Sequence, residues 1–403
     1  MGQPAPRLGL RLGRPRRRAL RARLPGPPEH RLRRSGFGRV GGCGDGPPAR
    51  SPRRPRAGAL PPLADARQPL RLGVREQPGR RPRRRHHRIH RVTLRDGQLA
   101  RLLVMDVETG VERMVAESAV LHIEAPNWTP DGRWLVVNAE GGLWRLPAPD
   151  PEEPDPDLPE PAVDFQAVDL GGVPPINNDH VMAPDGAHVY VSGRDGHLYD
   201  VLWNDGAGGQ GRRITADRDP ALGFKNYLHG VSPDGSMLSV IGGQLDARGE
   251  WTTNIHLVPV DGGPTTQLTD DGFPDDGAEF SPDGGWLYFN SERGSDLPGH
   301  AQLFTMRTDG SDTHQFTADE RVNWFPHPSP DGEHIVYLSF PPGTLGHPAD
   351  HDVILRVIDR QSHRTRDLAA FPGGQGTINV TSWAPDSRRF AYVAYPFEAP
   401  SLT

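Results

Sequence analysis

Short segments in which apolar and polar residues alternate dominate the chain from about residue 96 onward. Six of them follow a tight turn: "RWLVVN", "AHVYVSG", "SMLSVIG", "GWLYFNS", "EHIVYLS" and "RRFAYVA". This period of two, with many β-branched and aromatic residues, predicts half-buried β-strands. The turn before each segment reads Pro-Asp-Gly or Pro-Asp-Ser, in which proline fixes φ and glycine allows a positive φ.

These turns recur at a nearly constant interval. Their prolines are Pro130, Pro184, Pro233, Pro282, Pro330 and Pro385, spaced by 54, 49, 49, 48 and 55 residues. Each interval has room for four short strands, the last of them exemplified by "QLTDD" and "HQFTAD". A repeat near fifty residues with four strands per repeat predicts the blades of a β-propeller.

The count of strands predicts how the ring closes. Five repeats supply four strands each, and they are expected to begin at Glu124, Asn178, Tyr227, Asp276 and Phe325. The last repeat, Asn379–Tyr395, supplies only two strands, and Arg101–Ser118 at the other end of the sequence supplies two more. We therefore predict an all-β, six-bladed propeller in which strands from both ends share the closing blade and leave no unpaired sheet edge.

The first residues differ in composition from the rest. Residues 1–90 hold 25 Arg and 4 acidic residues, whereas residues 91–403 hold 21 basic and 47 acidic residues, a net charge of −26. An Arg-, Pro- and Gly-rich segment buries too little apolar surface to fold. We interpret residues 1–95 as a disordered appendage or the product of a start site assigned too early, with a polyanion-binding arm as the functional alternative. The propeller is then residues 96–403.

Further expectations come from what the sequence lacks. It contains no apolar run of membrane-spanning length, no secretory signal and a single cysteine, Cys43. We expect a cytoplasmic monomer without a membrane span. The acidic propeller is not expected to bind nucleic acid.

The residues that precede each turn are candidates for a binding site. In a propeller blade they lie on the innermost strand, at the end of the central channel opposite the turns. This channel mouth is predicted to bind a ligand through a set of polar and aromatic side chains: Asn177, Asp179, His180, His229, Asp276, Glu279, Asn323, Trp324, His327, Gln375 and Asn379. Loops at the same end can add His347, His351, Arg293 and His300.

Several chemical roles fit these residues. His180, His229 and His327, with Gln375, form a set that could hold a divalent transition metal. Histidine with a carboxylate could instead act as acid and base on a sugar. The structural alternative is that these side chains satisfy backbone groups next to the turns.

The repeats also resemble a known family. "APNWTPDGRWLVVN", "FSPDGGWLYFNSERG" and "NWFPHPSPDGEHIVYLS" are similar to the WD40-like (PD40) repeats of TolB-type propellers, and the resemblance covers Leu102–Tyr395. It implies a binding protein for a small polar or carbohydrate-like ligand, or for a peptide partner. A more distant resemblance to oligogalacturonate lyases implies the alternative, a metal-dependent lyase or hydrolase acting on acidic saccharides. This chain departs from those lyases in having six blades rather than seven and no compact cluster of Gln and His.

Overall fold

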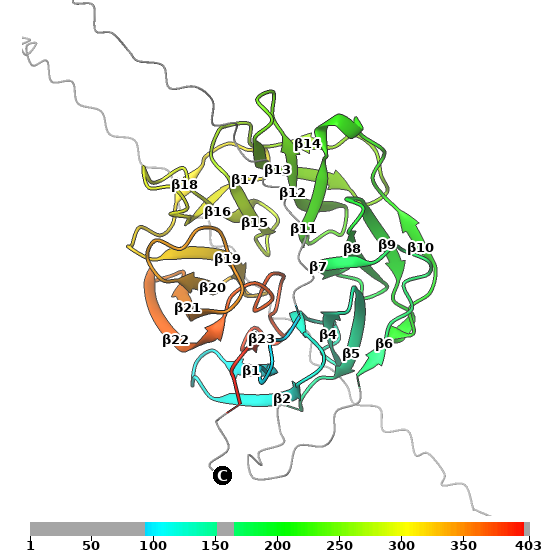
Figure 1. Cartoon of the computed structure of the whole chain (residues 1–403), viewed down its shortest axis with the longest axis vertical. Coiled ribbons are helices and arrows are strands. Elements are labelled where there is room, and N and C mark those ends of the chain that lie inside the picture. The colour runs from blue at the N-terminus through cyan, green and yellow to red at the C-terminus, as the bar shows by residue number, and fades with distance from the viewer. Residues whose placement is uncertain (1–92, 151–164, 399–403) are drawn as a thin grey trace, which may run out of the picture. The chain divides into compact units, whose positions relative to one another are not determined.

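The computed structural model describes residues 93–150 and 165–398. Within these ranges the chain forms twenty-three strands and two short 3₁₀ helices, and the strands form six sheets arranged around a ring (Figure 1). The prediction of an all-β, six-bladed propeller is confirmed. The appendage predicted for residues 1–95 lies outside the described residues, except for the last three.

Five blades have four antiparallel strands each, paired in chain order. The first is β3 (Glu124–Trp128), β4 (Trp134–Ala139), β5 (Gly142–Pro147) and β6 (Gln166–Ala167). The second is β7 (Ile176–Met182), β8 (His188–Gly193), β9 (Leu198–Leu202) and β10 (Gly211–Arg213), with helices η1 (Asn204–Gly206) before β10 and η2 (Pro220–Leu222) after it. The third is β11 (Lys225–Val231), β12 (Met237–Leu245), β13 (Trp251–Pro259) and β14 (Thr266–Gln267).

The fourth blade is β15 (Asp275–Phe280), β16 (Trp286–Ser291), β17 (Gln302–Arg307) and β18 (His314–Gln315). The fifth is β19 (Val322–Pro328), β20 (His334–Phe340), β21 (His351–Asp359) and β22 (Arg364–Gly373). In all five, the first strand contacts the first strand of at least one neighbouring blade, so these strands surround the channel. They begin up to three residues earlier than the sequence predicts.

The sixth blade joins the two ends of the propeller. β23 (Arg389–Ala394) pairs with β1 (Ala100–Asp106), which pairs with β2 (Glu112–Ser118). In this register Leu102 lies opposite Val393, and both are completely buried. The predicted closure is confirmed, but the innermost segment differs from a regular strand. Residues 377–384 meet β23 through an isolated bridge between Trp383 and Phe390 and a few hydrogen bonds.

The four Pro-Asp-Gly turns that follow Ser or Thr share one construction, seen clearly at Ser281–Gly284. The Ser281 hydroxyl donates to Asp283 Oδ1 at 2.6 Å and accepts a hydrogen bond from Trp286 N at 2.9 Å. Gly284 has φ +70°, and a Cβ added there would lie 3.5 Å from Pro233 of the preceding blade. A Cβ would fit here at ordinary van der Waals distance. Glycine is therefore needed for its positive φ and not for lack of space. Each turn is therefore packed beside the turn of its neighbour.

An irregularity recurs in the innermost strands and shapes the channel mouth. The register against the second strand shifts between Glu124 and Asn127 in β3 and between Ile176 and His180 in β7. It shifts again in β11, β15 and β19. A β-bulge leaves extra residues unpaired and re-aims their side chains. The direction of a mouth side chain therefore depends on its position relative to the bulge.

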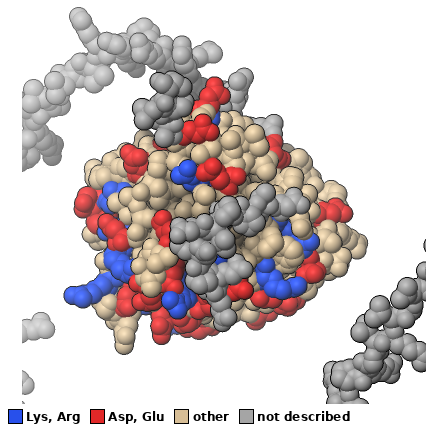
Figure 2. All heavy atoms as spheres, turned by 90° about the horizontal axis from the view of Figure 1, so that it is seen from below, with Lys and Arg blue, Asp and Glu red and all other residues tan. Residues whose placement is uncertain are grey.

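The outer surface carries charges of both signs, and acidic side chains are spread over the face shown in Figure 2 with basic ones between them. In residues 93–150 and 165–398, no helix is long and apolar enough to span a bilayer.

Candidate functional site

A pocket of about 300 Å³ lies at the channel mouth, where the innermost strands begin. It is lined by residues from four of the complete blades and from the segment that leads into the closing blade: Asn177, Asn178, Asp179, Tyr227, His229, Trp251, Thr253, Asp276, Phe325, His347, Gln375 and Asn379. Polar groups and aromatic rings therefore face the same small space.

An ion pair between a buried histidine and a partly buried aspartate lines this pocket. His229 Nε2 is 2.9 Å from Asp276 Oδ1, and His229 Nδ1 is 3.2 Å from the carbonyl oxygen of Asn379. Burial opposes a charged ring, but the hydrogen bond and charge of Asp276 outweigh it and raise the pKa of His229 to about 9. Burial likewise opposes the Asp276 carboxylate, but His229 holds its pKa below the usual value. The pair is therefore ionised at neutral pH.

Asp179 is a second carboxyl group in the pocket, and it behaves differently. Its side chain accepts a hydrogen bond from Asn177 Nδ2 at 2.5 Å. Burial, opposed by the charge of His229 and reinforced by the charge of Asp276, raises the pKa of Asp179 to about 7. Asp179 can therefore gain or lose a proton near neutral pH when its surroundings change.

Aromatic side chains form the remaining walls. The His347 ring lies 4.6 Å from the ring of Trp324 and 5.1 Å from that of Phe325, measured between centroids. Burial lowers the pKa of His347. Trp324 is buried and packs against His347, whereas Trp251 lines the pocket and is 40% exposed. The pocket thus includes one indole side chain that is accessible to solvent.

Six of the eleven predicted mouth residues line this pocket: Asn177, Asp179, His229, Asp276, Gln375 and Asn379. His347, expected from a loop, joins them. The other five (His180, Glu279, Asn323, Trp324 and His327) do not line it. Three of these, His180, Glu279 and His327, are the residues at which regular pairing resumes after the bulge, so their side chains are aimed elsewhere.

His327 lies in a contact between blades. Its Nδ1 is 2.5 Å from Glu279 Oε2, and its Nε2 is 2.5 Å from the carbonyl oxygen of Ile378. Both ring nitrogens are therefore occupied within the fold. His180 is also completely buried, neither of its ring nitrogens has a well-formed side-chain partner, and burial lowers its pKa to about 4.

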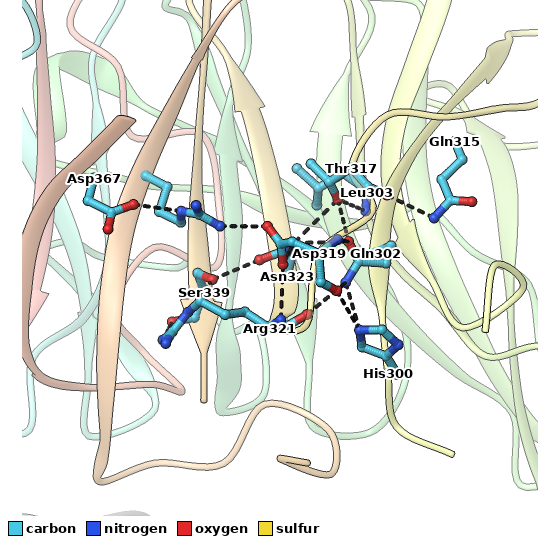
Figure 3. A network of polar contacts seen from close by, with 11 residues as sticks. His300, Gln302, Leu303, Gln315, Thr317, Asp319, Arg321, Asn323, Ser339 and Asp367 are labelled. Atoms are coloured by element: carbon cyan, nitrogen blue, oxygen red, sulfur yellow. Dashed lines mark hydrogen bonds and ion pairs between the residues drawn. The ribbon is translucent and has the colours of Figure 1, made fainter. Parts of the chain in front are cut away.

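Asn323 belongs to a polar network that joins the fourth and fifth blades (Figure 3). Its Nδ2 donates to Gln302 Oε1 at 3.1 Å, and its Oδ1 accepts a hydrogen bond from the Ser339 hydroxyl at 2.8 Å. Arg321 binds Ser339 as well, and Asp319 is 2.7 Å from Arg356. Because every polar atom of Asn323 is engaged in this network, its role here is structural.

The predicted metal ligands do not converge. In the part of the chain that the structure describes, no group of three or more His, Cys, Asp or Glu side chains could hold a metal ion. His229 is paired with Asp276, His327 with Glu279, and His180 lies in the interior.

Sequence reasoning missed five lining residues: Asn178, Tyr227, Trp251, Thr253 and Phe325. Asn178 and Phe325 lie within bulges. Phe325 has φ +56°, and a positive φ is rare for a bulky residue, so the sequence gives no sign of it. Trp251 and Thr253 come from β13, whose hairpin with β12 extends over the mouth. The length of the pattern "WTTNIHLVP" was the only available sign of that extension.

Exposed apolar side chains gather at the same end of the propeller. They lie in connections that lead into innermost strands or join second to third strands, or at the strand ends that flank such a connection. We call six of them the apolar rim: Leu222, Leu245, Trp251, Phe273, Leu297 and Leu345. Their exposed fractions range from 36% to 70%. Exposed apolar side chains at the end of a molecule that also holds a polar pocket are typical of a protein-binding surface.

Comparison with known proteins gives concordant findings. A family model described as the TolB β-propeller domain (PD40) matches residues 222–365. An uncharacterized protein of Agrobacterium fabrum is 34% identical over 296 residues, which cover 72% of this chain and 91% of that protein. The solved structure of a candidate TolB from Agrobacterium tumefaciens is 34% identical, with a TM-score of 0.63, and the match covers 75% of this chain and 99% of that one.

A weaker similarity concerns an oligogalacturonate lyase in complex with manganese. It is 14% identical, with a TM-score of 0.45 over 70% of this chain and 76% of that one. Similarity at this level does not bear on chemistry.

Proposed function

The chain belongs to the TolB-type β-propeller family, and on this premise we propose that it is a binding module whose channel mouth takes a peptide segment of a partner protein. The apolar rim contacts the segment, and the pocket receives one uncharged, hydrogen-bonding side chain. The observation that carries this proposal is a polar pocket of side-chain size at the end of the propeller that also carries the exposed apolar rim, with Trp251 belonging to both.

The chemistry of the pocket favours an uncharged polar group. His229 and Asp276 neutralise each other, so neither needs a charged ligand. Gln375 and Asn379 offer amide groups that can both donate and accept hydrogen bonds, whereas the Asn177 amide is engaged with Asp179. An amide or hydroxyl group can satisfy several of these at once, while Trp251 covers its apolar part.

The alternative of a lyase or hydrolase acting on acidic saccharides has less support. No Arg or Lys is among the described residues that line the pocket, although these side chains are the usual partners of sugar carboxylates. One observation favours chemistry: Asp179, with a pKa of about 7, has the property expected of a general base. Product release from neutral and acidic saccharides would identify such an enzyme.

Selection from a displayed peptide library tests the proposal. The wild-type protein should enrich a peptide family, and Trp251→Ala and Gln375→Ala should each weaken binding of those peptides about tenfold or more. His334→Ala is the matched control on β20, away from the mouth, and should bind as wild type does. Failure to enrich any peptide family, or peptides that bind both mouth variants as tightly as the wild-type protein, would refute the proposal. Neutral saccharides added as competitors would reveal a carbohydrate site.

A further inference from the structure

We propose that Gly243 on β12 determines what the mouth pocket can bind, because it leaves room for the Trp251 indole to lie against the strand and form a wall of that pocket. Gly243 itself is not among the described residues that line the pocket, so it is a positioning residue that acts through Trp251. The inference rests on the proposed function, because it concerns the same pocket and the same partner segment.

The space beside Gly243 is filled by aromatic rings. A Cβ added to Gly243 would lie 2.4 Å from Trp251 Cζ2, 3.0 Å from Trp251 Cε2 and 3.2 Å from Tyr227 Cε2. Non-bonded carbon atoms are most stable about 3.5–4.0 Å apart, so the indole leaves no room for a side chain at this position. Both rings belong to residues that line the mouth pocket.

Glycine is required at this position for space and not for its backbone conformation. The φ of Gly243 lies outside the positive range that favours glycine, so other residue types could adopt the same backbone. A glycine inside a strand weakens it, because the unfolded chain gains entropy and the strand loses a side chain that could pack. The indole that occupies the free space is what offsets this loss.

The register of the hairpin explains how the indole reaches Gly243. Thr253 lies opposite Gly243, and Trp251 lies opposite Leu245, two residues further along β12. Paired residues and residues two apart share one face of a sheet, so Trp251 stands on the face of Gly243 and reaches back across it. Because Trp251 is 40% exposed, the core does not enclose it, and a side chain at residue 243 would displace the ring.

A displaced indole changes the mouth pocket in either direction of movement. A ring that turns into the pocket reduces its volume of about 300 Å³, and a ring that turns away removes one of its walls. Both movements take away the apolar surface that Trp251 offers to the partner segment. Gly243 therefore sets the shape of the pocket without lining it.

The neighbouring glycine, Gly242, provides a matched control on the opposite face of the same strand. A Cβ there would lie 2.6 Å from His256 Cδ2 and 2.7 Å from Phe224 Cζ. These two rings pack edge to face, with centroids 5.7 Å apart, and neither residue is among the described residues that line the mouth pocket. Gly242→Ala therefore causes a similar steric conflict on the side away from the pocket.

Binding of the peptides that the wild-type protein selects from the displayed library tests the role of Gly243. Gly243→Ala should weaken binding about tenfold, whereas Gly242→Ala should stay within about twofold of wild type although both changes lower the melting temperature. Gly243→Ala combined with Trp251→Ala should bind no more weakly than Trp251→Ala alone, because the glycine acts through the indole. Equal losses in the two glycine variants, or losses at Gly243 and Trp251 that add, would overturn the proposal.

A measurement that needs no ligand keeps the test decisive. In protein labelled with fluorotryptophan, the fluorine NMR signal of Trp251 is identified by its loss in Trp251→Phe. Gly243→Ala should shift this signal and Gly242→Ala should not, and an unshifted signal in Gly243→Ala would overturn the proposal. If Gly243→Ala fails to fold, adding Trp251→Ala should restore folding, and failure to restore it would also overturn the proposal. A shifted signal without any selected peptide would refute the proposed function but support the positioning of the indole by Gly243.

Discussion

The ion pair between His229 and Asp276 should make the propeller less stable at alkaline pH. The pKa of His229 is about 9 in the folded protein and about 6.5 in an unfolded chain. Because the folded-state pKa is the higher one, the stabilisation is fully present below pH 6.5 and is lost as the pH rises through 9. Asp179 acts with the same sign, but its pKa of about 7 places most of its effect below neutrality.

The magnitude follows from the two pKa values of His229. At pH 7 the folded ring is almost always protonated and the unfolded ring is mostly neutral, which corresponds to a free-energy difference of about 2–3 kcal/mol. At pH 9 the folded ring is half protonated, and less than about 1 kcal/mol remains. The free energy of unfolding should therefore fall by about 2 kcal/mol between pH 7 and pH 9.

Urea unfolding at pH 7, 8 and 9, followed by tryptophan fluorescence, measures this difference as a shift of the midpoint at constant slope. Asp276→Asn and His229→Gln should each flatten the pH dependence, because either change removes the pair. His334→Gln removes an imidazole that lies 3.1 Å from Glu108 at the other end of the propeller, and it should keep the wild-type dependence. A wild-type protein equally stable at pH 7 and pH 9, or a His229→Gln variant that retains the full loss, would refute the reasoning.

Three further predictions concern stability. Deleting Arg101–Ser118 should abolish cooperative thermal unfolding or cause aggregation, because it leaves the outer edge of β23 unpaired. Deleting residues 1–92 should leave the melting temperature within a few degrees, and similar behaviour of the two truncations would contradict the closure. Asn323→Ala should cost about 2 kcal/mol or more in urea unfolding, because Gln302 and Ser339 lose a buried partner; a neutral effect would show that the network is dispensable. Gly284→Ser should destabilise by about 1 kcal/mol through its φ of +70°, and an unchanged midpoint would mean that the turn relaxes without cost.

The fold could be predicted because it repeats. The interval between Pro-Asp-Gly turns, the alternation in each strand and the two strands missing from the last repeat each pointed to the same ring. The candidate site was predicted less well, because the direction of a side chain depends on the bulge. Asp276 and Glu279 are three residues apart on β15, yet the first lines the mouth pocket and the second lines a separate pocket beside the Pro-Asp-Gly turns. Three bulge residues, Ala125, Gly277 and Phe325, have a positive φ. Only for Gly277, with φ +63°, does the amino-acid type itself suggest that conformation.

The shared closing blade also imposes an order on synthesis. The end of β23 at residue 394 follows the end of β1 at residue 106 by 288 residues. At typical rates of translation, β1 waits on the order of 15–60 s for its partner to leave the ribosome. During that time its edge can accept the equivalent strand of a neighbouring nascent chain, since both offer the same sequence. Chains made close together on one messenger could therefore exchange closing strands. A larger distance between ribosomes on the messenger would favour rings closed within a single chain.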